Sequence, residues 1–199
     1  MDYLIISIGQ AGNQINFELS NLLLNNDNIN SSLIYPNNPN TNILNTNFSK
    51  TFQGDLAKSI LIDSEQKVVK KFTDKNFNKN WSLYKEGVNL ITNSSGRGNN
   101  WALGYSLEYK EPKKINKFFN LEEDNKNISL ESFELINKFL EKCDFIKGFL
   151  SIHSLNGGTG SGVTTRVIEM LREEFPKFNF VDCPVVGMDS KKYKKYIKN

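Results

Sequence analysis

One glycine-rich segment constrains the fold of this chain more than any other feature. Residues 156–162 read Asn-Gly-Gly-Thr-Gly-Ser-Gly, after a β-prone apolar run at 148–154 and before a helical pattern that starts at Val163. A glycine turn between a strand and a helix leaves backbone N–H groups open to an anion, and the helix dipole adds positive charge. The segment therefore predicts a phosphate-binding loop in a protein that alternates strands with helices.

The side chains of this loop suit the same ligand. The hydroxyls of Thr159 and Ser161 can donate hydrogen bonds to phosphate oxygens that Gly157, Gly158 and Gly160 allow to approach. We expect a di- or triphosphate as ligand, and a valine at position 160 should occupy the space of a phosphate. The alternative is a flexible Gly-Ser turn without a ligand, which the flanking strand and helix disfavour.

The loop differs from two common nucleotide motifs. It lacks the Lys-Ser/Thr ending of a Walker A loop, which disfavours the P-loop enzymes. The first predicted strand is not followed by GxGxxG, which argues against a dinucleotide-binding enzyme on a Rossmann sheet.

Strand and helix patterns alternate along the rest of the chain. Strands are predicted at 3–8, 59–63, 88–92, 148–154 and 180–186, and helices at 11–24, 65–72, 129–143 and from 163 to Pro176. This order predicts an α/β fold, a Rossmann-like parallel sheet with helices on both faces. Residues 1–199 form one domain in this interpretation, with exposed loop excursions at 25–55 and 108–128.

Three predicted helices carry specific expectations about their buried face, and in the last of them Val163, Val167, Met170 and Leu171 share one face. In the first, the apolar stripe consists of Ile15, Leu19, Leu22 and Leu23. In the third, Ser129 is the expected N-cap, and the inner face consists of Leu130, Phe133, Ile136, Leu140 and Cys143.

Polar or glycine-rich segments follow the first four strands, at 9–14, 63–65, 96–101 and 157–162. Ligands of an open α/β sheet bind beyond the carboxyl ends of its strands, so these segments predict one shared site. Asp63 and Glu65 can hold hydrated Mg²⁺ against phosphates, although helix capping by Asp63 fits its spacing equally well. Gln10 either orients a water or phosphate oxygen or is an ordinary polar residue at a helix start.

Three other features favour structural interpretations. His153, the one histidine, lies inside a predicted strand and is interpreted as a satisfied core residue. Trp101 is expected to pack between elements rather than to stack on a base. The lysines at the C-terminal end are interpreted as a solvated tail; they are Lys191, Lys192, Lys194, Lys195 and Lys198.

Composition narrows the classes of partner. The net charge is +3, from 25 basic and 22 acidic residues, and the basic residues include three arginines only, so no nucleic-acid partner is predicted. Two cysteines without metal-ligand spacing exclude a disulfide scaffold. We expect neither a signal peptide nor a membrane span, and hence a cytosolic protein without a membrane partner.

Together, these segments resemble the tubulin superfamily in order and spacing. The matching segments are residues 9–14 (Gly-Gln-Ala-Gly-Asn-Gln), 61–65 (Leu-Ile-Asp-Ser-Glu), 98–102 (Gly-Asn-Asn-Trp-Ala) and the glycine loop at 157–162. Residues 98–106 and 141–144 resemble delta-tubulin in detail, since no histidine separates Gly104 from Tyr105. The resemblance covers nearly all of this chain and less than half of a tubulin.

The resemblance implies a GTP site with Mg²⁺. It implies that Gln10 and Ala11 line the phosphates and nucleoside, that Glu65 serves Mg²⁺ and that Asn99 contacts phosphate. Four residues would hold the phosphate tail: Ser154, Gly158, Thr159 and Gly160. The sequence departs from the family pattern at Ala11 (usually cysteine), Gln66 (usually proline) and Asn156 (usually glycine), where asparagine can tolerate a positive φ.

The resemblance also implies the biological setting. The partners would be other tubulin subunits in longitudinal contact, in the cytoplasmic cytoskeleton at a centriole or basal body. In the family, guanine-reading residues and the hydrolytic acid come from segments beyond these 199 residues, so GTPase activity of this chain is left open and no catalytic residue is assigned. The alternative is a truncated remnant that keeps the phosphate-binding half and assembles nothing.

Overall fold

A computed structural model describes residues 3–25, 48–51, 54–76, 84–93, 96–106, 127–143 and 146–187. The elements in chain order are β1 (Tyr3–Ile8), α1 (Gly9–Asn25), β2 (Phe48–Thr51), β3 (Gly54–Ala57), β4 (Ser59–Asp63), α2 (Gln66–Thr73), β5 (Leu90–Thr92), α3 (Trp101–Tyr105), α4 (Ile128–Leu140), β6 (Gly148–Ser154), the π-helical turn η3 (Thr159–Val163), α5 (Thr164–Glu174) and β7 (Asn179–Val185). None of the helices in these ranges is long and apolar enough to cross a membrane.

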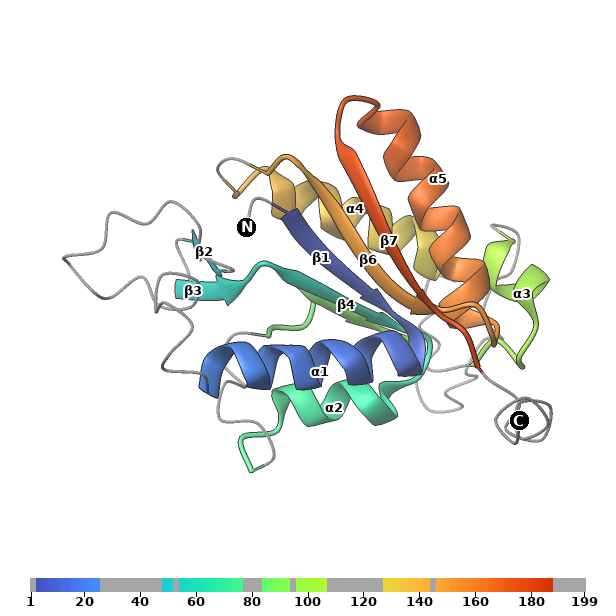
Figure 1. The fold of residues 1–199 in the computed structure, drawn as a ribbon, viewed down its shortest axis with the longest axis horizontal. Coiled ribbons are helices and arrows are strands. Elements are labelled where there is room, and N and C mark those ends of the chain that lie inside the picture. Colours follow the sequence, from blue (N-terminus) through green and yellow to red (C-terminus); the bar gives the residue numbers. More distant parts are fainter. Residues whose placement is uncertain are drawn as a thin grey trace, which may run out of the picture.

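Five strands form one parallel sheet in the order β5-β4-β1-β6-β7. Figure 1 shows α1 and α2 on one face of this sheet and α4 and α5 on the other. The α/β Rossmann-like fold predicted from the sequence is therefore confirmed. The chain adds β4 and then β5 on one side of β1, and it adds β6 and then β7 on the other side. The strand order therefore reverses between β1 and β6.

The main core lies on the face covered by α4 and α5. Because side chains alternate along a strand, Leu4, Ile6 and Ile8 of β1 all point to this face. They pack with buried side chains of β4, β6, α4, η3 and α5: Ile60, Ile62, Phe149, Ile128, Leu135, Ile136, Phe139, Val163, Val167 and Leu171. The predicted stripe of the last helix is thereby confirmed at Val163, Val167 and Leu171.

The predicted apolar stripe of α1 is wrong at Ile15; Leu19 is half-buried, and the side chains of Leu22 and Leu23 lie outside the described residues. Ile15 is 39% exposed, whereas Asn13 and Asn16 are buried against the sheet. Gly12 lies on the same buried face, where a Cβ would collide with the carbonyl oxygen of Ile152. Hydrophobic spacing failed here because the buried face of this helix carries two asparagines that hydrogen-bond to the strands.

The predicted start and inner face of α4 are also corrected. Asn127 is the N-cap and accepts a hydrogen bond from the backbone N–H of Ser129, which is itself buried in the first turn. The helix ends at Leu140, and Leu130 is 43% exposed, so the buried face is rotated by about one residue from the predicted one. Asparagine caps a helix as well as serine does, and here Asn127 supplies the cap two residues before the predicted one.

Two predicted loops meet the described residues only in part. The strands β2 and β3 form an antiparallel pair at the end of the segment 25–55, which the sequence predicted as irregular loop. Residues 26–47 of that loop, residues 108–126 of the second one and the lysines at 191–198 lie outside the described residues.

Candidate functional site

A cavity of about 490 Å³ opens at the carboxyl edge of the sheet, a volume typical of small-ligand sites. The segments after β1, β4, β5 and β6 all contribute to its lining, which confirms the predicted convergence of four loops on one place. The cavity lies where the strand order reverses, between the loops that leave β1 and β6. Its lining residues are Gln10, Ala11, Gln14, Asp63, Ser64, Glu65, Lys67, Val68, Arg97, Gly98, Asn99, Ser154, Asn156, Gly157, Gly158, Thr159 and Gly160.

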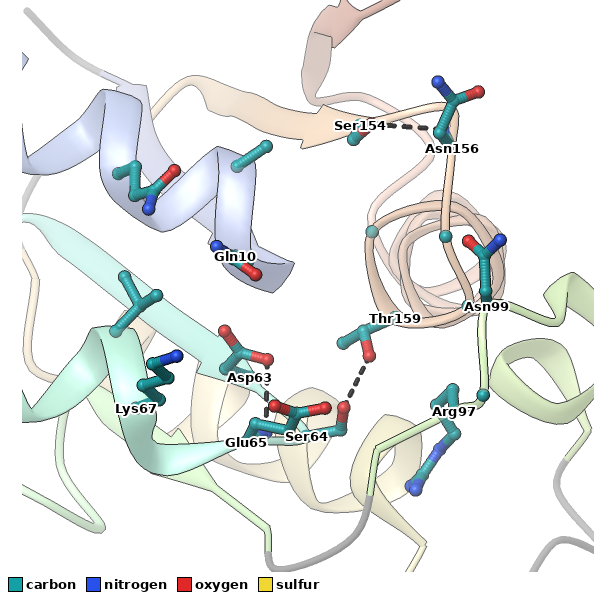
Figure 2. A pocket seen from close by; sticks show the side chains of 17 residues that line it. Gln10, Asp63, Ser64, Glu65, Lys67, Arg97, Asn99, Ser154, Asn156 and Thr159 are labelled. Atoms are coloured by element: carbon teal, nitrogen blue, oxygen red, sulfur yellow. Dashed lines mark hydrogen bonds between the residues drawn. The ribbon is translucent and has the colours of Figure 1, made fainter. Parts of the chain in front are cut away.

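The structure brings nearly all the sequence-predicted site residues to this cavity. Ser161 is the exception, because it is buried and its hydroxyl donates to the carbonyl oxygen of Gly157 within the loop. Ser64 and Arg97 stand inside the predicted segments 63–65 and 96–101 without having been singled out, whereas sequence reasoning missed Lys67 and Val68 of α2. Figure 2 shows Gln10, Asp63 and Thr159 around one central space, with Asn99 and Asn156 on its far side.

The start of the glycine loop depends on one left-handed residue. Gly157 has φ +91°, a conformation that costs a residue with a Cβ about 1–2 kcal/mol. Asn156, which the sequence suggested for a positive φ, does not adopt one, and its N–H donates to Ser154 Oγ at 3.1 Å. Among the described residues, Asn99 is the residue with a side chain that does, with φ 54°, and its Oδ1 lies beside Gly157, 3.7 Å from where a Cβ on that glycine would be.

Close backbone contacts explain several of the other glycines. A Cβ on Gly162 would lie 2.8 Å from the Cα of Gly104, because α3 packs directly on η3. A Cβ on Gly160 would lie 3.1 Å from the backbone N and O of Ser154, so it would point toward β6. The expected reason for a Gly160→Val defect is therefore wrong: the valine would displace the loop from the strand instead of filling the space of a phosphate.

The acidic wall of the cavity holds a carboxylate in an unfavourable place. Asp63 is 4% exposed, and burial raises its pKa from 3.8 to about 6, although hydrogen bonds from the Glu65 N–H at 3.2 Å and from Asn13 lower it. Glu65 is exposed beside it. No group of three metal-binding side chains occurs among the described residues, so two carboxylates with water and phosphate oxygens would have to complete a Mg²⁺ shell.

A hydroxyl pair connects the acidic wall to the glycine loop. Ser64 Oγ and Thr159 Oγ1 lie 2.5 Å apart across the floor of the cavity (Figure 2). The exposed Lys67 adds a cation to the lining. Arg97 is 3% exposed, and its side chain runs away from the central space in Figure 2. The site therefore combines helix N-termini, hydroxyls, two carboxylates and a lysine, a set suited to a polyphosphate with a divalent cation.

The predictions for His153 and Trp101 had opposite results: one is confirmed and the other is wrong. His153 is 4% exposed and has partners at both ring nitrogens, which confirms its interpretation as a satisfied core residue. Trp101 is 47% exposed and stacks on Tyr105 at 4.6 Å, so the expectation that it packs between elements is wrong. It also does not line the cavity.

Comparison with known proteins agrees with this geometry. The human tubulin delta chain is 31% identical over 179 residues, 88% of this chain and 36% of that protein. The tubulin beta-6 chain of Gallus gallus is 30% identical over 190 residues, 92% of this chain and 38% of the relative. The human tubulin epsilon chain is 34% identical over 126 residues, which cover 63% of this chain and 22% of the relative.

The chain thus spans well under half the length of each of these three relatives. Residues 2–199 match the family described as the tubulin/FtsZ family, GTPase domain. The match includes all four loops that line the cavity. This chain belongs to the tubulin/FtsZ family.

Proposed function

We propose that this chain binds GTP together with Mg²⁺ in the cavity at the carboxyl edge of its sheet. The observation that carries the proposal is the convergence of four loops on one space of about 490 Å³. Three of these loops lead directly into α1, α2 and the η3–α5 helix, whose N-termini favour an anion.

The glycine loop is the proposed site of the phosphate tail. Thr159 and the backbone of Gly157, Gly158 and Gly160 line the cavity and can donate to phosphate oxygens, and Ser154 lies at the end of β6 beside them. Ser161 acts indirectly in this proposal, through its bond to the Gly157 carbonyl. Gln10 and Ala11 would line the phosphates and nucleoside from α1, and Asn99 would contact phosphate from the opposite wall.

Asp63 and Glu65 are the proposed Mg²⁺ residues. A divalent cation beside Asp63 would stabilise its ionised form, which burial disfavours. Glu65 is exposed to the same space and needs no desolvation to reach the ion or its water shell. Lys67 lies two residues beyond Glu65 and would balance the phosphate charge.

A pair of glycine variants tests the phosphate site. Gly157→Ala and Gly87→Ala both place a methyl on a residue with positive φ, at +91° and +73°, and Gly87 is not part of the cavity. Both variants should lose similar stability, about 1–2 kcal/mol each. Titration of a fluorescent GTP analogue with Mg²⁺ should show binding weakened roughly tenfold in Gly157→Ala alone. Equal affinity of the two folded variants would overturn the site.

Selectivity and chemistry are separate questions. We propose that the residues that recognise the base and the acid that promotes hydrolysis belong to segments outside these 199 residues. GTP and ATP should therefore bind with similar affinity, and neither should be hydrolysed. Competition binding and phosphate release measure both properties. Strong preference for GTP over ATP would contradict the proposal for base recognition, and release of phosphate by this chain would contradict the proposal for hydrolysis.

We further propose a delta-type role in the cytoskeleton, with other tubulin subunits as longitudinal partners at a centriole or basal body. The support is the motif at 98–106, without a histidine between Gly104 and Tyr105, and the 31% identity with the human tubulin delta chain. A fluorescently tagged chain should concentrate at centrioles or basal bodies. Uniform staining along microtubules would instead favour a beta-like role, since the beta-6 chain is similarly related at 30% identity.

A further inference from the structure

A buried histidine joins the glycine loop to the edge strand of the sheet. His153 Nδ1 lies 2.7 Å from the carbonyl oxygen of Gly160, and Nε2 lies 3.1 Å from Oδ1 of Asp182. Asp182 belongs to β7 and also accepts a hydrogen bond from the hydroxyl of Ser151. The imidazole ring therefore spans the distance between a cavity-lining residue and β7.

Hydrogen-bond chemistry assigns protons to both ring nitrogens. A carbonyl oxygen only accepts, so the contact with Gly160 requires a proton on Nδ1, and an ionised carboxylate only accepts, so the contact with Asp182 requires one on Nε2. A neutral imidazole has a single N–H and would leave one of the two contacts between acceptors. An imidazolium satisfies both, and the Asp182 carboxylate compensates its buried charge.

Among the described residues, the other hydrogen-bond partners of the ring are uncharged. Ser154 on β6 presents its carbonyl oxygen 3.3 Å from Nδ1, and the peptide of Gly160 belongs to η3. Gly12 of α1, which has no side chain, packs against the backbone of residues 152 and 153. Asp182 of β7 is thus the charged group that contacts His153.

The bond to Gly160 fixes a peptide of the loop. In a planar trans peptide the carbonyl and the next N–H point in opposite directions, so a carbonyl held at His153 orients the N–H of Ser161 away from the core. Gly160 is also closely packed on two further sides. A Cβ on Gly9 would lie 2.9 Å from its nitrogen, and a Cβ on Gly160 itself would lie 3.1 Å from the backbone of Ser154. A shift of the imidazole would therefore move the loop that lines the cavity.

We propose that His153 is a positioning residue of the phosphate site: as an imidazolium it ties the Gly160 carbonyl to Asp182 and so makes the glycine loop depend on β7. This inference rests on the proposed function for its ligand, the phosphate tail of a nucleotide. His153 does not line the cavity and touches no ligand in this proposal.

Two substitutions of His153 separate its two bonds. In His153→Asn the amide nitrogen can take the place of Nδ1 and keep the bond to Gly160, whereas in His153→Gln it can take the place of Nε2 and keep the bond to Asp182. Asp182→Asn removes the carboxylate charge from a strand position whose side chain is 43% exposed, so this variant should fold. Cys183→Ser, at an exposed neighbouring position of β7, is the matched control.

The experiment combines imidazole NMR with titration of GTP and Mg²⁺ on the full chain. Because the chain has one histidine, a single imidazole appears in the ¹⁵N spectrum. Wild type should show protons on both ring nitrogens, and Asp182→Asn should lose the proton on Nε2. His153→Gln should weaken binding roughly tenfold, His153→Asn should stay within about threefold of wild type, and Cys183→Ser should leave binding unchanged.

The outcomes distinguish this proposal from the proposed function. An Nδ1 without a proton, or a folded His153→Gln variant that binds GTP as tightly as wild type, would overturn the positioning role alone. A folded wild-type chain that binds no GTP would overturn the proposed function and the ligand role together, whatever the imidazole spectrum shows.

Discussion

The helix α1 on one face of the sheet and the helices α4 and α5 on the other are attached to the strands by different contacts. On the face of α4 and α5, Ile136, Phe139 and Leu171 pack on apolar strand residues. Beneath α1, by contrast, Asn13 and Asn16 form a buried hydrogen-bond network with the strands. Ser7 donates to Asn13 Oδ1 at 2.8 Å, Asn13 donates to the Ile62 carbonyl at 3.0 Å, and Asn16 donates to Ser59 Oγ at 2.7 Å.

Apolar contacts and hydrogen bonds contribute differently to the stability of the fold and to the position of each helix. Apolar burial is roughly proportional to area and has little directional preference, so it holds α4 and α5 without fixing their atoms closely. Hydrogen bonds depend steeply on distance and angle, so the asparagines set where α1 lies along β1 and β4. Since α1 begins at the cavity with Gln10 and Ala11, its placement decides the geometry of that wall.

Removing an aromatic ring from the apolar face should have the largest effect. Phe139 is 1% exposed in α4, and Phe139→Ala should cost about 3–5 kcal/mol of unfolding free energy through lost burial and the remaining cavity. Urea denaturation measures this loss. Leu130→Ala on the same helix, at a side chain 43% exposed, is the control and should change stability far less. Similar losses in both variants would refute the assignment of the buried face.

Removing the buried charge beside the cavity should increase stability. The pKa of Asp63 is raised to about 6, so the folded state binds a proton more readily than the unfolded state. Its contribution is therefore most favourable below about pH 4 and is lost as the pH rises toward 6, a change of about 3 kcal/mol.

Denaturation between pH 4 and pH 7 should show this slope in wild type and lose it in Asp63→Asn, which should be the more stable protein near neutrality. Glu134→Gln, at an exposed position of α4, should keep the slope. The same Asp63→Asn variant should bind Mg²⁺ with GTP more weakly, because it lacks one of the two proposed Mg²⁺ carboxylates. The wild-type residue would then be kept for function at a cost in stability. A slope that survives in Asp63→Asn would contradict this account.

Breaking the polar face should have an intermediate effect on stability with a distinct effect on binding. Asn13→Ala leaves the Ile62 carbonyl and the Ser7 hydroxyl without this partner, at a cost of about 1–3 kcal/mol. Because α1 also loses its anchor, nucleotide binding should weaken, whereas Leu171→Ala should lower stability and leave the affinity of the folded fraction unchanged. Equal effects of both variants on binding would break the distinction between the two faces.

The smallest effect is expected at the exposed aromatic pair. Trp101→Ala removes a stack on Tyr105 at a side chain 47% exposed, so the loss should stay below about 1 kcal/mol. Neither nucleotide affinity nor the denaturation slope should change, because Trp101 does not line the cavity. A marked loss of nucleotide affinity in a folded Trp101→Ala variant would assign this residue to the site after all.

Prediction from the sequence succeeded where the signal is local and apolar. The run at 148–154 forms the predicted strand, the glycine segment follows it as the predicted loop, and α5 shows the predicted stripe at Val167 and Leu171. It failed for α1, whose buried face carries Asn13 and Asn16. Their burial depends on partners 43 to 50 residues away in sequence, which no helical spacing reveals.

The sequence by itself determined the order of the five strands of the main sheet and of α1, α2, α4 and α5, the four loops at the strand ends and the family, because glycine, hydroxyl and carboxylate residues stand at fixed places beside apolar runs. Only the tertiary structure decided which side chains meet. It placed Ser161 inside the loop, joined Ser64 to Thr159, buried Asp63 and set His153 between Gly160 and Asp182. These are contacts between distant parts of the chain, and their energies depend on burial and geometry that exist only after the sheet has formed.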